Sequence, residues 1–189
     1  MSWILIPSLI VAVIWIFGLP SAGKSTLAAG LAKSLREQRR SCLVLDGDEL
    51  RGGLCQGLGF TEADRSENLR RAAEVALLAA RSEISVIVAM ITPLAAHREM
   101  ITKILRHVLL QWVWADCPAE TCRSRDVKGL YQKQQAGELE GLTGADAGFE
   151  APGTEVFRLD TLRLNVAESV QILLDIALEP LEPKVQNPI

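Results

Sequence analysis

The stretch from Gly18 to Thr26 carries residue types and a spacing suited to holding a polyphosphate. It reads GLPSAGKST and fits G-x-x-x-x-G-K-S/T, the phosphate-binding loop (P-loop) pattern of nucleoside-triphosphate enzymes. Glycines let several backbone N–H groups point at one phosphate, and the following helix adds partial positive charge at its N-terminus. In this pattern Lys24 reaches the β- and γ-phosphates, while Ser25 is the metal ligand and holds Mg²⁺ through its hydroxyl. The predicted ATP-contacting residues of the loop are Gly18, Ser21, Ala22, Gly23, Lys24, Ser25 and Thr26.

Two carboxylates follow a short apolar run at residues 42–45, where they would emerge at the carboxyl end of a strand. These are Asp46 and Asp48, and ligands collect at that edge in open α/β sheets. Phosphoryl transfer to a hydroxyl needs a carboxylate that accepts or orients its proton, so Asp46 joins Lys24 as a predicted catalytic residue. Contact with Mg²⁺, directly or through water, is a second role open to Asp46. The alternative is a simple turn with solvated carboxylates.

Apolar runs alternate with helical patterns along the chain, which predicts an α/β fold of the P-loop NTPase class. We expect a doubly wound, mostly parallel five-stranded sheet flanked by helices, with a mobile lid. The expected strands span residues 11–17, 42–45, 85–91, 109–115 and 155–159. The expected helices span residues 26–36, 67–81, 95–107, 119–125 and 167–177.

Length, net charge and cysteine content favour a single-domain protein and argue against nucleic-acid binding and a zinc site. The chain has 189 residues, enough for one domain with a core, and we expect that domain at residues 9–180 with a tail at 181–189. The net charge of −3 gives no electrostatic case for binding nucleic acid. The four cysteines form no C-x-x-C pair and lie far in sequence from both histidines, so we expect no zinc site. Reduced thiols in a cytoplasmic protein are the simpler interpretation.

Residues 1–23 carry no charged side chain, and the apolar stretch at residues 1–17 comes close to the length of a membrane helix. Pro7 and Ser8 interrupt the run, and no Lys or Arg precedes it as a signal peptide would require. Gly18 must also end a strand for the P-loop to work, which commits residues 11–17 to the sheet. We therefore expect no membrane span, and the apolar lead-in at residues 1–8 has no role that the sequence reveals.

The segment at residues 126–153 differs from the rest because it is rich in glycine and charge and poor in aliphatic side chains. A stretch of this length without strong periodicity is more often functional than idle. In phosphoryl-transfer enzymes a mobile lid that excludes water is commonly built in this way, so we predict a lid here. An ordinary surface loop is the alternative.

A series of further motifs follows the P-loop in a fixed order. They read LDGDELR at 45–51, GLGF at 57–60, DRSENLRR at 64–71, ITP at 91–93, RDVKGLY at 125–131, AGE at 136–138, LTG at 142–144 and EAP at 150–152. In order and spacing this series resembles the adenylylsulfate kinase (APS kinase) family over about residues 11–177. The resemblance implies transfer of the γ-phosphate of ATP to the 3′-hydroxyl of adenosine 5′-phosphosulfate (APS), giving PAPS for sulfate activation. It also implies a homodimer.

The resemblance assigns roles to single residues. Arginines such as Arg51 and Arg65 would give forked, charge-assisted bonds to phosphate or sulfate, and Phe60 would stack on the acceptor adenine unless it is a core aromatic. Arg70 and Arg71 are better explained as a solvated helix face paired with Glu62 or Glu67. The implied acceptor-binding positions are Asp48, Arg51, Phe60, Arg65, Asn68, Ile91, Thr92, Lys128, Gly141 and Leu142. The implied additional ATP-binding positions are Arg125, Leu164 and Ser169.

Departures from the family pattern cluster on the acceptor side. The family usually has Phe where this chain has Leu142, Arg where it has Ala95 and Gln135, and Lys where it has Glu140. Two alternatives follow: an APS kinase with a relaxed lid, or a kinase for another nucleotide-like acceptor, such as a cytidine diphosphate-linked intermediate. A third alternative is a non-catalytic nucleotide-binding regulator. The presence of Lys24, Ser25 and Asp46 together speaks against it.

Overall fold

A computed structural model describes residues 11–138, 141–145 and 147–179. The lead-in at 1–8, the tail at 181–189 and Glu140 lie outside the described residues.

Within this described part, five parallel strands form one sheet in the order β2-β3-β1-β4-β5. The strands are β1 (Ala12–Phe17), β2 (Cys42–Asp46), β3 (Ser85–Ala89), β4 (Leu109–Asp116) and β5 (Phe157–Asp160). Strand β1 is central, and its Ile14 pairs with Ile87 of β3 on one side and Gln111 of β4 on the other. The connection from β1 to β2 runs toward one edge of the sheet, and the connection from β3 to β4 runs toward the other edge. The carboxyl ends of β1 and β3 therefore flank the crevice in which ligands bind in such sheets.

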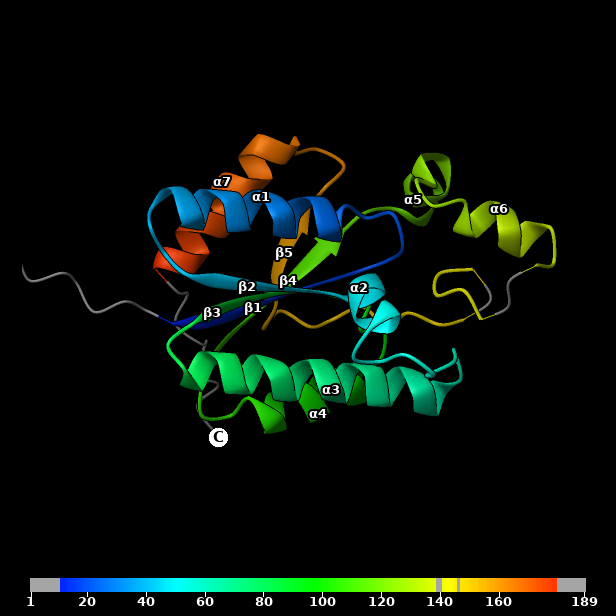
Figure 1. Cartoon of the computed structure of the whole chain (residues 1–189). Coiled ribbons are helices and arrows are strands. Elements are labelled where there is room, and N and C mark those ends of the chain that lie inside the picture. Colours follow the sequence, from blue (N-terminus) through cyan, green and yellow to red (C-terminus); the bar gives the residue numbers. More distant parts are fainter. Residues whose placement is uncertain (1–10, 139–140, 146, 180–189) are drawn as a thin grey trace, which may run out of the picture.

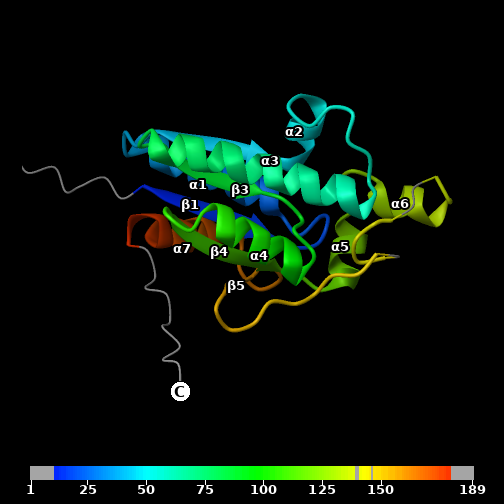
Figure 2. The same cartoon turned by 90° about the horizontal axis from the view of Figure 1, so that it is seen from below.

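Helices cover both faces of the sheet. Helices α1 (Lys24–Glu37) and α7 (Val166–Leu178) lie on one face, and α3 (Glu62–Arg81) and α4 (Ala95–Ile104) lie on the other (Figure 1). The shorter α2 (Gly47–Gly52), α5 (Ala119–Arg125) and α6 (Leu130–Gln135) gather at the carboxyl ends of the strands (Figure 2).

The core has two layers because the side chains of β1 alternate between the faces of the sheet. Ile14 and Ile16 pack with α1 and α7, whereas Val13, Trp15 and Phe17 pack with residues of α3 and α4. All six side chains of β1 are buried, which matches the apolar run that precedes the P-loop.

The predicted doubly wound, parallel α/β fold is confirmed, with differences at the element ends. Helix α3 begins at Glu62 rather than at residue 67, because Thr61 caps it by accepting a hydrogen bond from the N–H of Asp64 at 3.2 Å. Strand β3 ends at Ala89 rather than at residue 91, and α4 ends at Ile104 rather than at residue 107. The short helices α2 and α6 were not expected from the sequence.

The described ranges contain no helix long and apolar enough to cross a membrane.

Candidate active site

The P-loop begins with a backbone path that only glycine can follow. Gly18 has φ +150°, and a Cβ there would lie 2.5 Å from the carbonyl oxygen of Ala115 on the neighbouring strand. Its N–H donates to the carbonyl of Ile91 at 3.3 Å, which ties the loop to the segment after β3. Gly23 is the left-handed N-cap residue of α1, with φ +94°. The loop therefore turns sharply from a buried strand into a helix N-terminus, where an anion binds well.

Lys24 lies at the start of α1 with its ammonium group folded back over the loop. Its Nζ donates to the carbonyl oxygen of Leu19 at 2.7 Å. Burial lowers the pKa of Lys24 to about 8, and the nearby Lys128 acts in the same direction. A phosphate group bound here would supply a counter-charge and stabilise the protonated form of this partly desolvated side chain.

Asp46 joins the P-loop to the edge of the sheet. The hydroxyl of Ser25 donates to Oδ2 of Asp46 at 2.6 Å, and the N–H of Asp48 donates to Oδ1 at 2.9 Å. The second bond caps α2, so the same carboxylate fixes the helix that carries Arg51 into the site. The Ser25 hydroxyl and the Asp46 carboxylate are hard oxygen donors placed together at the P-loop, a donor set that fits Mg²⁺.

A second group of side chains faces the P-loop from α2 and α3. The guanidinium carbons of Arg51 and Arg65 lie 4.5 and 5.5 Å from the ring centroid of Phe60. Phe60 is 56% exposed, which rules out a core aromatic and leaves its ring accessible to a ligand. Arg51 donates to the carbonyl of Gly59 at 2.8 Å, and Arg65 donates to that of Phe60 at 2.8 Å, so the cations and the ring form one unit.

Asn68 lies on α3 beside this unit and is 4% exposed. Its amide oxygen has no hydrogen-bond partner among the described residues. A buried acceptor left without a donor costs free energy, and in a native structure it points to a missing partner. A ligand donor in the cavity would supply one.

The segment at residues 126–153, for which the sequence predicts a lid, reaches across the site at three points. Arg65 donates to the carbonyl oxygen of Gly141 at 2.6 Å, and Lys128 forms an ion pair with Asp48. Tyr131 of α6 is buried, and its hydroxyl donates to the carbonyl of Pro20 in the P-loop at 3.4 Å. The segment at 126–145 thus contacts both the P-loop and the arginine side of the site.

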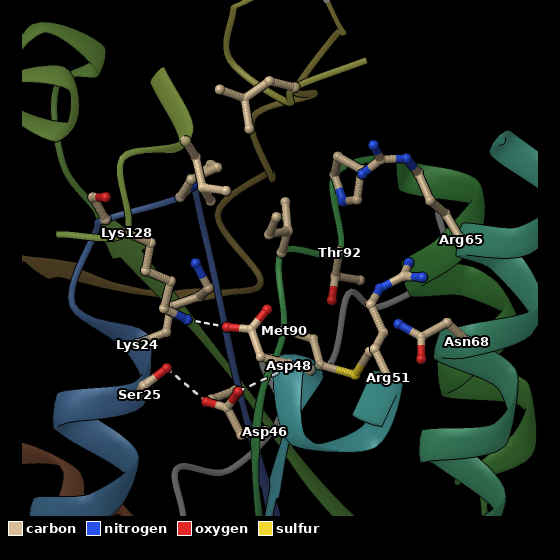
Figure 3. Close-up of a pocket in the computed structure, with 18 of the residues that line it drawn as sticks. Lys24, Ser25, Asp46, Asp48, Arg51, Arg65, Asn68, Met90, Thr92 and Lys128 are labelled. Atoms are coloured by element: carbon tan, nitrogen blue, oxygen red, sulfur yellow. Dashed lines mark hydrogen bonds and ion pairs between the residues drawn. The ribbon is translucent and has the colours of Figure 1, made fainter. Parts of the chain in front are cut away.

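Together these elements enclose a cavity of about 340 Å³, a size suited to a small-molecule ligand. Figure 3 shows Lys24, Ser25 and Lys128 on one side, Arg65 and Asn68 on the other, with the two aspartates between them. The predicted site residues that line it are Ser21, Gly23, Lys24, Ser25, Thr26, Asp46, Asp48, Arg51, Phe60, Arg65, Asn68, Ile91, Thr92, Lys128, Gly141 and Leu142. The lining residues missed from the sequence are Pro20, Gly47, Leu69, Ala89, Met90, Pro93, Val127 and Leu130.

Comparison with known proteins agrees with this geometry. The family model for adenylylsulphate kinase matches residues 11–160. This chain belongs to the adenylylsulphate kinase family. An adenylyl-sulfate kinase of Bacteroides thetaiotaomicron is 43% identical over 171 residues, 90% of this chain and 85% of that protein. One of Enterobacter sp. is 44% identical over 164 residues, covering 87% and 81% of the two chains. The structure of the Mycobacterium tuberculosis APS kinase CysC in complex with AMPPNP and APS superposes with a TM-score of 0.85 at 39% identity, over 88% of this chain and 96% of that one.

Most of the missed lining residues lie inside the P-loop and the family motifs, and the other two, Ala89 and Met90, come directly before ITP. Gly47 lies between the two aspartates, and Pro93 completes the ITP motif. Val127 and Leu130 flank Lys128 and Gly129 inside RDVKGLY, so membership of a motif was the signal that could have found them.

Five predicted residues do not line the cavity. Gly18 and Ala22 form the base of the loop, and Ser169 is buried on α7. Arg125 donates to the carbonyl of Thr161 at 2.9 Å, beside the turn that holds Leu164. Arg125 and Leu164 therefore belong to a neighbouring surface next to α5.

The family departure at Leu142 lies in the cavity wall, where this side chain is 6% exposed and packs into the core. The expectation for Arg70 and Arg71 is confirmed with Glu67 as the partner: they donate to its carboxylate at 2.7 and 2.9 Å.

Proposed function

We propose that this chain transfers the γ-phosphate of ATP to the 3′-hydroxyl of APS, giving PAPS and ADP. The observation that carries the proposal is a single cavity with a P-loop on one side and a cationic, aromatic acceptor site on the other. Family membership and relatives named adenylyl-sulfate kinase support APS as the acceptor. The related M. tuberculosis enzyme has been solved with both an ATP analogue and APS.

The ATP half of the reaction uses the P-loop. The backbone N–H groups at the start of α1 hold the phosphates, and Lys24 contacts the β- and γ-phosphates with its ammonium group. Ser25 and Asp46 would hold Mg²⁺. When bound, Mg²⁺ neutralises charge on the β- and γ-phosphates during transfer.

The acceptor half uses the opposite wall. Arg51 and Arg65 bind the anionic phosphosulfate, Phe60 stacks on the adenine, and Asn68 accepts a hydrogen bond from the ligand. Lys128 leaves Asp48 to contact the acceptor when the lid segment closes over it. Charge complementarity and a stacked base then fix the position of the 3′-hydroxyl.

Asp46 orients the hydroxyl and receives its proton. Each carboxylate oxygen has two lone pairs, so Asp46 can accept this bond while Ser25 and the Asp48 N–H stay in place. The 3′-oxygen then bonds to the γ-phosphorus as the bond between that phosphorus and the bridging oxygen breaks. ADP leaves with the bridging oxygen.

An ADP-release assay with APS tests the proposal directly. We expect Mg²⁺-dependent turnover with APS and turnover at least about tenfold weaker with other nucleotide acceptors, including a cytidine diphosphate-linked one. The Lys24→Ala variant is the control for contaminating activity and should be inactive. Preference for another acceptor would replace APS in the proposal, and ATP binding without any turnover would favour the non-catalytic regulator.

The resemblance to APS kinases also supports a homodimer in solution. Light scattering on the purified protein should then give about twice the 20.6 kDa mass of one chain. A mass of a single chain would contradict it.

A further inference from the structure

Thr92 has a strained backbone in the wall of the cavity. Its φ is +44° and its side chain is 1% exposed. A β-branched residue rarely adopts the left-handed region, and such strain persists only where neighbours force it. Strained residues cluster at ligand-binding and active sites, so the contacts that hold Thr92 in this conformation are candidates for a role in ligand binding.

Two side chains hold Thr92 from the sheet and from α4. The indole N–H of Trp15 donates to the hydroxyl oxygen of Thr92 at 2.9 Å. Arg98 donates to the carbonyl oxygens of Thr92 and Pro93 at 3.4 and 3.3 Å, and its guanidinium lies over the ring of Phe17. Both Arg98 contacts are longer than a typical N–H···O hydrogen bond, so Arg98 holds the turn at Pro93 only weakly.

Glu150 supplies two further contacts from near the end of the segment predicted as a lid. Its backbone N–H donates to the carbonyl of Pro93 at 2.9 Å, and its Oε2 accepts from the N–H of Ala95 at 2.5 Å. Helix α4 begins after Leu94, which has no side-chain group able to cap it. The Glu150 carboxylate therefore acts as a remote cap, and its charge also suits a helix N-terminus.

We propose that Glu150 is a positioning residue that clamps the turn at residues 92–95 so that this wall holds the acceptor. The inference rests on the proposed function, because the wall matters only if an acceptor binds against it. Glu150 does not line the cavity, so it acts through Thr92 and Pro93, which do.

The clamp acts on the acceptor more than on ATP. In Figure 3 Thr92 lies on the same side of the pocket as Arg65 and Asn68, across from Lys24 and Ser25. The P-loop has its own supports, including the helix N-terminus of α1 and the bond from Lys24 to Leu19. The bond from Gly18 joins the loop to Ile91, which precedes the turn at residues 92–95 that Glu150 contacts. Loosening the turn would therefore change the acceptor wall more than the triphosphate site.

The test compares three substitutions of Glu150 with one matched control. Glu150→Gln keeps the length of the side chain and an acceptor oxygen, Glu150→Asp keeps the charge but is one methylene shorter, and Glu150→Ala removes both. Glu155→Gln is the control for charge, because Glu155 and Glu150 both act electrostatically on Arg98, whereas the hydrogen bond of the Glu155 carboxylate comes from the N–H of Gly153 at 3.3 Å and not from the turn at residues 92–95. The KM and kcat for ATP and APS are measured for each, with hydrogen exchange of residues 91–98 in the ligand-free protein.

We expect Glu150→Ala and Glu150→Asp to raise the KM for APS about tenfold and to speed exchange at residues 91–98 by a similar factor. The KM for ATP should stay within about twofold, and Glu150→Gln and Glu155→Gln should match the wild type within about threefold. Unchanged exchange in Glu150→Asp, an equal rise in both KM values, or a Gln variant as impaired as the Asp variant would overturn the clamp. Failure of the wild type to use APS would count against the proposed function alone, because the exchange comparison still decides whether Glu150 holds the turn.

Discussion

The two sides of the cavity are built in different ways. The side proposed for ATP comes from one contiguous stretch, because Gly18 to Thr26 supplies the backbone donors, the ammonium and the hydroxyl. The side proposed for the acceptor comes from α2, the loop before α3, α3 itself, the turn after β3 and the predicted lid segment. The first depends on local backbone geometry, whereas the second depends on tertiary contacts such as that between Arg65 and Gly141.

This difference explains where the sequence departs from its family. A contiguous loop has few positions that can change without loss of its geometry, since even a methyl group at Gly18 would collide with Ala115. A wall assembled from several segments can exchange single contacts. The departure at Leu142 lies in that wall, and the departure at Ala95 lies at the start of α4, two residues after the lining residue Pro93. Substitutions on the two sides should therefore differ in which substrate they affect.

The largest effect is expected at Asp46, which serves both sides. Asp46→Asn keeps an oxygen that can cap α2, because Asn is as good an N-cap residue as Asp. It removes the charge and the proton acceptor, so we expect kcat to fall by about 10²–10⁴ while the fold is kept. Steady-state kinetics and circular dichroism check this. An active Asp46→Asn variant would remove Asp46 from the chemistry.

Two arginines on α3 test whether the acceptor is bound by direct contact. Arg65 contacts Phe60 and the lid segment, whereas Arg70 is paired with Glu67 on the outer face of the helix. We expect Arg65→Ala to raise the KM for APS about 10- to 100-fold through loss of a charge-assisted bond. Arg70→Ala should change it less than about twofold. Equal effects of the two substitutions would mean that net charge, and not contact, attracts the acceptor.

The sequence predicts those parts of the fold that depend on local pattern. The buried run at β1, the P-loop and the alternation of strands and helices follow from periodicity and a contiguous motif. Helices α2 and α6 were missed because six residues are too few to show helical periodicity. Both depend on carboxylate caps: Asp46 caps α2, and Asp126 accepts from the N–H groups of Tyr131 and Gln132 in α6.

The candidate site also has a part that the sequence predicts and a part that only the folded structure shows. Most acceptor residues could be named only through the family resemblance, and the structure then brings them to one cavity. The contacts that hold them were beyond the sequence, because Lys128 and Asp48, or Glu150 and Ala95, meet only once the chain has folded. Burial cannot be read from residue type either. The oxygen of Asn68 is buried without a hydrogen-bond partner among the described residues, and the sequence does not show this.

Asn68 offers a test in which stability and function move apart. Asn68→Leu replaces a buried amide, whose oxygen has no partner in the described part of the chain, with an apolar side chain of similar size. We expect the melting temperature to stay the same or rise, because an unsatisfied polar group is removed. The KM for APS should rise about tenfold through loss of a hydrogen bond, with the KM for ATP unchanged. A lower melting temperature would show that the Asn68 oxygen is already satisfied in the free protein.

The smallest effect is expected on the ATP side and comes from pH. Burial lowers the pKa of Lys24 to about 8 in the free protein, and triphosphate charge stabilises its ammonium form. ATP binding above the free pKa must therefore take up a proton, so affinity is highest below that pKa and weakens as the pH rises through it. From about pH 7.5 to about pH 9 we expect a roughly five- to tenfold loss of ATP affinity in calorimetry, with proton uptake that depends on the buffer. Lys24→Arg should flatten this profile because arginine stays charged. A wild-type profile as flat as that of the variant would mean that the P-loop ammonium is solvated and that burial does not tune the pKa of the cation on the ATP side.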